Sequence, residues 1–235
     1  MSIRKKLGLL FLHALPLDGS MWTAQRHLLP DSSYAPTLYP FGDSIEAWAA
    51  AALSAAKGDR LVVVGCSVGG SCALELAALA PDRVATIVLI GTKAEHRPDP
   101  GLHAAALRTI HSEGLEEAWK IFWAPLFSRS AANRAIEEAK QIMLRQSAAD
   151  IARGVTVFHS RPSRSQFLAT FPRPVIFITG ADDVSPGVDV SEAQAELAQR
   201  GRLHVVPGCG HYVPLERPKN LNSILDEVIA TCSKE

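Results

Sequence analysis

The sequence predicts an α/β fold with a mostly parallel sheet of about six strands and helices on both faces. Short apolar runs rich in Val, Ile and Leu alternate along the chain with longer segments of helical character, which is the order typical of a doubly wound sheet. Several of these runs are continuously apolar, as expected of strands that are buried on both faces. With 235 residues, the chain is long enough for one large domain with a single core.

The first half of the chain follows this alternation without interruption. The apolar runs predict strands at residues 7–12, 34–38, 60–66 and 84–90. An Ala-rich helix is expected at residues 43–57, because Gly58 follows as a stop, and a second at residues 68–80, ahead of Pro81. This half therefore supplies four strands and two connecting helices.

The strand at residues 60–66 runs into the next helix through Gly65-Cys66-Ser67-Val68-Gly69. These residues match GxSxG, the nucleophile elbow, in which a sharp strand-to-helix turn leaves a serine hydroxyl exposed. Glycines are needed there because strand and helix press together at the turn. Such a pentapeptide arises by chance in about one chain of this length in ten. The flanking strand and helix are therefore what favour a nucleophile over an ordinary helix N-cap.

The composition favours a small-molecule partner. Lys and Arg number 24, as do Asp and Glu, so no net charge attracts nucleic acid or an anionic membrane. The four cysteines show neither metal-ligand spacing nor a small-scaffold disulfide pattern, which indicates a reducing compartment. We expect a cytoplasmic monomer or homodimer with no nucleic-acid or membrane partner. The basic and apolar start resembles a signal peptide, but its apolar run is short and contains an expected strand.

The alternation breaks in the second half of the chain. Residues 92–174 contain no convincing strand, although a parallel crossover needs only a dozen or so residues. The excess predicts helices at residues 102–112, 115–123, 130–146 and 148–158. The alternation then resumes, with strands expected at residues 175–179 and 203–206 and helices at residues 191–199 and 216–231.

Four segments resemble the α/β-hydrolase superfamily, in particular its esterases and 3-oxoadipate enol-lactonases. They are LLFLHALPLDGSMW, the elbow, and the pair formed by GADD and GCGHYVPLERP. The resemblance implies the α/β-hydrolase fold with a helical cap inserted before the strand that carries the acid. Residues 1–92 and 168–235 would form the core, and residues 93–167 the cap. Relatives usually begin with an antiparallel hairpin, for which this chain leaves little room upstream of Leu7.

The resemblance also implies the catalytic residues. The order Ser67, Asp183, His211 is that of α/β hydrolases, with Ser67 as nucleophile, His211 as general base and Asp183 as the acid that orients it. The backbone N–H groups of Leu15 and Val68 would form the oxyanion hole. Asp182 is the alternative candidate for the acid, in case the register of the loop is shifted by one residue. This chemistry requires no metal and no organic cofactor.

The expected cap contributes two further sets of candidates. Trp119, Phe122 and Trp123 share one face of a helix and are candidate substrate-binding residues, although the core of the cap would use the same pattern. Three arginines could hold a substrate carboxylate or lie on a solvated surface: Arg153, Arg161 and Arg164.

The sequence therefore predicts a serine hydrolase that cleaves a small, largely apolar carboxylic ester or lactone through an acyl-enzyme intermediate. Two alternatives stay open. One is a ligand-sensing or signalling protein with slow turnover, and the other is a hydrolase for carbon–carbon bonds, or a perhydrolase, with the same triad. All of these share one fold and one set of residues, so sequence motifs do not separate them.

Overall fold

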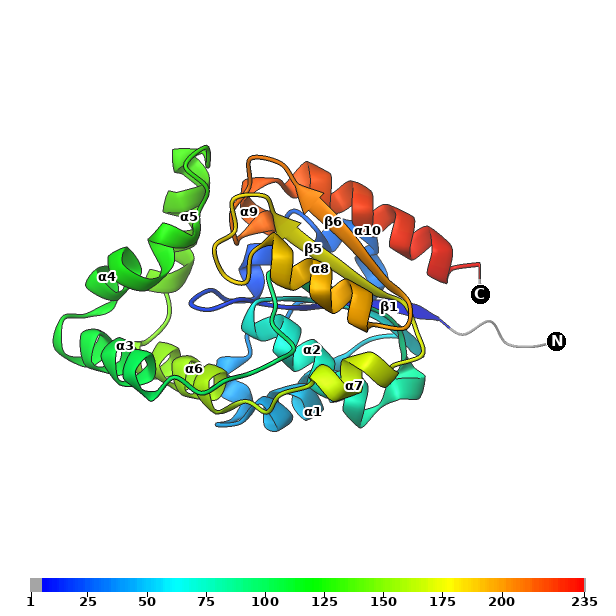
Figure 1. Ribbon diagram of the computed structural model, residues 1–235, viewed down its shortest axis with the longest axis horizontal. Coiled ribbons are helices and arrows are strands. Elements are labelled where there is room, and N and C mark those ends of the chain that lie inside the picture. The colour runs from blue at the N-terminus through cyan, green and yellow to red at the C-terminus, as the bar shows by residue number, and fades with distance from the viewer. Residues whose placement is uncertain (1–5, 235) are drawn as a thin grey trace.

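The computed structural model describes residues 6–234 and is built on one six-stranded parallel sheet (Figure 1). The strands are β1 (Leu7–Leu12), β2 (Ser33–Tyr34), β3 (Arg60–Cys66), β4 (Val84–Ile90), β5 (Val175–Gly180) and β6 (Gly201–Val206). Their order is β2-β1-β3-β4-β5-β6, and every neighbouring pair is parallel. The predicted parallel sheet of about six strands is confirmed, and no antiparallel pair occurs within residues 6–234. Residues 1–5 lie outside the described part of the chain.

The described chain also contains helices, some of which cover the two faces of this sheet. They are α1 (Ile45–Ala55), α2 (Val68–Leu79), α3 (Pro100–Ser112), α4 (Leu115–Ala118), α5 (Asn133–Leu144), α6 (Ala148–Ser160), α7 (Ser165–Thr170), α8 (Val188–Leu197), α9 (Val213–Glu216) and α10 (Pro218–Cys232). Helices α1, α2 and α7 lie on one side of the sheet and α10 on the other (Figure 1). The continuously apolar runs of β3 and β4 are buried between these layers. Within residues 6–234, no helix is long and apolar enough to cross a membrane.

Two expected elements differ from the observed ones, and one helix was not expected. The strand expected at residues 34–38 is only the short β2, because Pro36 has no N–H and the Leu38 N–H donates to a side chain, His13 Nε2, instead of a strand. The last helix is divided into α9 and α10 at Arg217, with Pro218 as the first residue of α10. Helix α7 was not expected, because six residues are too few for a clear helical period.

The segment between β4 and β5 is helical, as expected. Helices α3, α4, α5 and α6 lie at the left of Figure 1, on the side toward which the arrowheads of β5 and β6 point. The segment Trp119–Trp123 continues α4 as a π-helical turn. Helix α7 then returns the chain to the sheet, where it contacts α2 and α8. The division into a core and a cap at residues 93 and 167 stays a prediction.

The strand register brings the loops after the strands to one edge of the sheet. Leu12 of β1 is paired with Gly65 of β3, and Ile90 of β4 with both Cys66 and Ile178. After β1 the chain continues to β2 on one side, and β3 lies on the other side, so the strand order reverses between β1 and β3. Such a reversal is where open α/β sheets bind ligands.

Candidate active site

Ser67 occupies the turn between β3 and α2 in a strained conformation. Its φ is 54° and its ψ is −119°, and it is the only non-glycine residue with positive φ within residues 6–234. Such a conformation costs of order 1–3 kcal/mol and persists only where the surrounding structure imposes it. Every other residue from Leu61 to Ala77 is buried, whereas Ser67 is partly exposed. The turn therefore presents this one side chain at the surface of the core.

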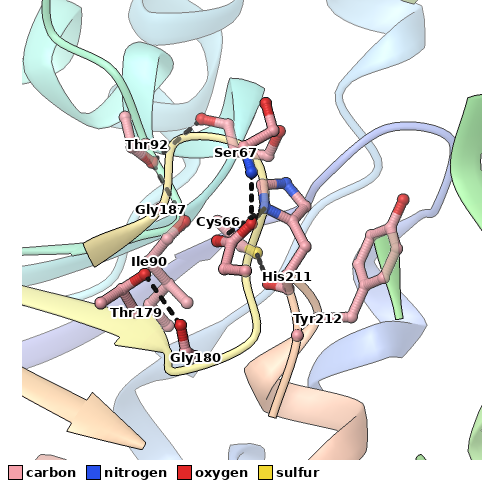
Figure 2. A network of polar contacts seen from close by, with 12 residues as sticks. Cys66, Ser67, Ile90, Thr92, Thr179, Gly180, Gly187, His211 and Tyr212 are labelled. Carbon is pink, nitrogen blue, oxygen red and sulfur yellow. Dashed lines mark hydrogen bonds and ion pairs between the residues drawn. The ribbon is translucent and has the colours of Figure 1, made fainter. Parts of the chain in front are cut away.

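The turn requires the backbones of β3, α2 and β1 to approach one another closely, and Gly65 and Gly69 permit this because they have no side chain. A Cβ on Gly65 would lie 2.3 Å from the Gly69 carbonyl oxygen, and one on Gly69 would lie 2.1 Å from that of Leu12. Helix α2 therefore begins directly against the ends of β3 and β1. Thr92 Oγ1, after β4, donates to the Ser67 carbonyl oxygen at 3.1 Å and holds the turn from the other side (Figure 2).

His211 and Asp183 form a buried pair beside this turn. His211 Nδ1 lies 3.1 Å from Asp183 Oδ2 and 3.2 Å from Oδ1, so the carboxylate accepts the Nδ1 proton and leaves Nε2 as an acceptor. The Ser185 N–H donates to Asp183 Oδ1 at 2.8 Å and fixes the carboxylate. No hydrogen bond joins Ser67 Oγ to His211 within residues 6–234. In enzymes without substrate this contact is often long and tightens on binding.

Gly91 is a site residue that the sequence motifs did not single out. It follows β4 with φ +54°, and a Cβ placed on it would lie 2.7 Å from His211 Nδ1 and 3.1 Å from Asp183 Oδ2. Only glycine therefore leaves room for the imidazole and carboxylate at this strand end. A glycine directly after a fully buried strand is the signal that could have identified it.

The two backbone N–H groups that were predicted to form the oxyanion hole have no acceptor among the described residues. They belong to Val68, the first residue of α2, and to Leu15, in the loop after β1. The Val68 N–H lies at the positive end of the helix dipole. The Leu15 carbonyl accepts from the Tyr212 hydroxyl at 3.0 Å, and the Tyr212 ring packs edge-on against His211. Tyr212, next to His211 in the sequence, therefore connects the histidine loop to the loop of Leu15.

Ser128, in the segment before α5, contacts the loop of Asp182 and, through Glu216, the loop of Gly210 and His211. Its hydroxyl donates to Asp182 Oδ2 at 2.6 Å, and its N–H donates to Glu216 Oε2 at 3.1 Å. The Gly210 N–H donates to the same Glu216 oxygen at 3.0 Å, and burial raises the pKa of Glu216. The structure thus places Asp183 against His211 and Asp182 against Ser128. Sequence analysis gave no role to Glu216, although it lies within GCGHYVPLERP, and no motif pointed to Ser128.

Two other reactive side chains lie close to the site but are held in unreactive forms. His13 Nε2 accepts from the Leu38 N–H at 2.8 Å, Nδ1 donates to the Ala14 carbonyl, and burial lowers the pKa of His13 to about 4. Cys66, beside Ser67, is fully buried, and burial raises the pKa of its thiol, which is therefore protonated at neutral pH.

A cleft of about 760 Å³ opens over Ser67 and Gly91. The aromatic candidates Trp119, Phe122 and Trp123 are not among the residues that line it. Both tryptophans are buried, and Trp119 packs at 6.0 Å from the Phe127 ring. Their role in substrate binding stays a prediction.

The three arginines have different surroundings. Arg153 pairs with Asp43 at 2.9 Å and Asp150 at 2.8 Å, and Arg164 donates two bonds of 2.7 Å to the Glu75 carboxylate. Arg161 alone of the three lines the cleft. Within residues 6–234, no group of three or more His, Cys, Asp or Glu side chains is arranged to hold a metal ion.

The fold and the site geometry together define a class of protein. Residues 9–224 match the model of the alpha/beta hydrolase family, so the chain belongs to this family and is a hydrolase. It is 26% identical to a pimeloyl-[acyl-carrier protein] methyl ester esterase of Aromatoleum aromaticum over 94% of this chain and 97% of that protein. It is 23% identical to a 2-hydroxymuconate semialdehyde hydrolase of Pseudomonas sp. over 94% and 86%, respectively.

Solved structures show the same likeness. A thermophilic esterase from Thermogutta terrifontis has a TM-score of 0.85 and 25% identity, over 97% of this chain and 90% of that chain. The enol-lactonase from Burkholderia xenovorans has a TM-score of 0.78 and 16% identity, over 98% and 92%, respectively, and shows the shared fold.

Proposed function

We propose that the protein is a serine hydrolase that cleaves a small carboxylic ester or lactone through an acyl-enzyme intermediate. The observation that carries the proposal is the strained and partly exposed Ser67, at a helix N-terminus beside a buried His–Asp pair. A strained residue in a cleft favours function over stability, because a stable fold alone gains nothing from such a conformation. The similarity to an esterase at 25% identity over most of both chains supports the same reaction class.

In the proposed mechanism, His211 Nε2 accepts the Ser67 proton while Ser67 Oγ attacks the carbonyl carbon. Asp183 stays ionised and stabilises the imidazolium. The N–H groups of Leu15 and Val68 donate to the tetrahedral oxyanion, each contributing about 10²- to 10³-fold. His211 then protonates the leaving alcohol, and water, activated by His211, hydrolyses the acyl-enzyme.

The test is a panel of short-chain aryl esters, lactones and ring-cleavage dienoates, assayed with the wild-type protein and Ser67→Ala. We expect turnover of about 1 to 10³ per second on an ester or lactone, and a loss of several orders of magnitude in Ser67→Ala. The matched control is Ser223→Ala, since Ser223 lies on α10 and its hydroxyl donates to the Lys219 carbonyl of the same helix. It should keep wild-type rates. Labelling by a fluorophosphonate, followed by mass spectrometry, should identify Ser67 as the modified residue.

The same panel separates the alternatives. Turnover confined to the dienoates would show that the reaction is carbon–carbon cleavage and not ester cleavage. Carbon–carbon cleavage is the second candidate function because of the similarity to a 2-hydroxymuconate semialdehyde hydrolase. Stoichiometric turnover on every substrate would indicate a ligand sensor. Turnover that survives Ser67→Ala unchanged would overturn the proposal.

A further inference from the structure

A buried guanidinium, that of Arg161, lies in the wall of the cleft that Ser67 also lines. Arg161 lines this cleft and is buried, with only 6% of the residue exposed. Within residues 6–234, no Asp or Glu forms an ion pair with it. A buried charge is costly unless it is paired, and Arg153 and Arg164 on the same segment are both paired. The unpaired charge of Arg161 is therefore the exception that needs a partner.

The position of Arg161 is fixed by the end of helix α6. Its Nη1 donates to the Phe158 carbonyl, and its Cζ lies 3.9 Å from the centroid of the Phe158 ring. A guanidinium has five N–H donors in a rigid fork, and the Phe158 carbonyl occupies one of them. Within residues 6–234, this guanidinium forms no other hydrogen bond, and Arg161 lines the cleft, so its remaining donors can serve a ligand there.

The other charges of the cleft do not supply this partner. Arg97 pairs with Glu95 at 3.0 Å on the surface, and Asp99 accepts from the Leu102 N–H at the start of α3. Lys93 and Asp189 also line the cleft and are exposed, so water screens them. Among the described residues that line the cleft, three cationic and three acidic side chains balance in formal charge, and only Arg161 of the cations is buried.

Two histidines beside Arg161 add hydrogen-bonding capacity without charge. Burial, and to a lesser extent neighbouring charges including Arg161, lower the pKa of His159 to about 4, and burial also lowers the pKa of His96. Both rings line the cleft. At neutral pH they are uncharged, so a ligand in this part of the cleft meets one full positive charge.

We infer that Arg161 binds a carboxylate carried by the substrate, so that the ester or lactone taken by this cleft is an anion. The inference rests on the proposed function and adds to it the class of substrate. A guanidinium binds a carboxylate through two parallel hydrogen bonds, and one buried positive charge matches one negative charge. A phosphate monoester, with a charge of about −1.5 to −2, would leave part of its charge unmatched.

The test compares charged and uncharged acyl chains of equal length. The charged substrates are the 4-nitrophenyl monoesters of glutaric, adipic and suberic acid, and the uncharged ones are the pentanoate, hexanoate and octanoate. At least one charged ester should exceed its partner about 10-fold or more in kcat/KM, and Arg161→Met should lower that ratio about 10-fold or more, mainly through KM. Carboxyphenyl acetate against phenyl acetate tests whether the carboxylate lies on the leaving group instead.

Arg153→Met is the matched control, because Arg153 lies on α6, the helix that Arg161 directly follows, but pairs with Asp43 and Asp150. It should keep the wild-type ratio. Arg161→Lys keeps the positive charge but loses the paired N–H donors of the guanidinium, so it should give an intermediate ratio. It replaces Arg161→Met as the test variant if Arg161→Met does not fold. Thermal denaturation verifies folding of each variant.

Calorimetric titration of glutarate, adipate and suberate into Ser67→Ala protein measures binding without turnover. Arg161→Met in this background should weaken binding about 10-fold or more. Ser67-dependent hydrolysis with equal rates for charged and uncharged esters, and no dicarboxylate binding, would overturn the anionic substrate and leave the hydrolase standing. Dicarboxylate binding through Arg161 without hydrolysis of any ester would support the carboxylate site and overturn the proposed reaction.

Discussion

Asp182 and Asp183 are neighbours in the chain, but their carboxylates have different partners. Asp183 is buried against His211 Nδ1, whereas Asp182 accepts from the Ser128 hydroxyl. Two adjacent residues after a strand point to opposite sides, so the same turn supplies one side chain to the site and one to the loop before α5.

The amide substitutions of these two residues should therefore differ. Asp183→Asn would favour the wrong histidine tautomer, and we expect kcat to fall about 10⁴-fold, the loss typical of such a change in serine proteases. Asp182→Asn keeps an oxygen that can accept from Ser128, so it should lose little activity. Steady-state kinetics on the best ester of the panel would measure both. The reverse order of losses would move the acid by one residue.

At the scale of elements, the ends of the strands determine how closely the catalytic loops approach. Gly91 at the end of β4 has positive φ and faces His211 and Asp183, whereas Gly114, before α4, has φ +88° and no atom within 4 Å of an added Cβ. Alanine at either position is strained by about 1–3 kcal/mol in the backbone. The methyl group of the alanine would contact His211 and Asp183 only at position 91.

Gly91→Ala should thus reduce kcat far more than Gly114→Ala at comparable loss of stability. A displacement of about 1 Å in a catalytic group can cost about 10²-fold, and we expect a loss of that size for Gly91→Ala. Urea unfolding gives the stability of each variant and ester hydrolysis gives its rate. Equal rates in the two variants would show that His211 does not depend on the space at Gly91.

At the scale of the whole molecule, burial of a neutral histidine makes stability depend on pH. The pKa of His13 is about 4 in the folded protein, below its ordinary value of 6.5, because burial disfavours the charged form. Between these values the unfolded chain binds a proton at His13 and the folded chain does not. The free energy of unfolding therefore falls as pH decreases from 6.5 to 4, by up to roughly 3 kcal/mol.

His13→Gln should remove this part of the pH dependence. The glutamine oxygen can still accept from the Leu38 N–H, but the side chain does not titrate. Urea unfolding at several pH values between 4 and 7 would show a shallower slope in the variant. His159→Gln measures the separate contribution of His159, whose pKa is also lowered to about 4. Parallel curves for wild type and His13→Gln would contradict the assignment.

Patterns within a few residues were enough to predict most of the elements. The apolar runs of β1, β3, β4 and β5 mark buried strands, and the glycine-flanked Ser67 marks a sharp turn. Their order and the family are confirmed. Where a local signal was mixed, as at Pro36 before Leu38, the expected strand was too long.

The tertiary structure alone decided how side chains from distant loops meet. Asp183 is 28 residues from His211, and the Tyr212 hydroxyl reaches Leu15 across 197 residues. The space at Gly91 and the missing partner of Arg161 likewise depend on which segments pack against them. The sequence by itself determined the strands, the elbow and the chain order of the candidate residues, because periodicity and turn chemistry act over a few neighbouring residues. Partners and empty space depend on strand register and packing, which only the folded chain establishes.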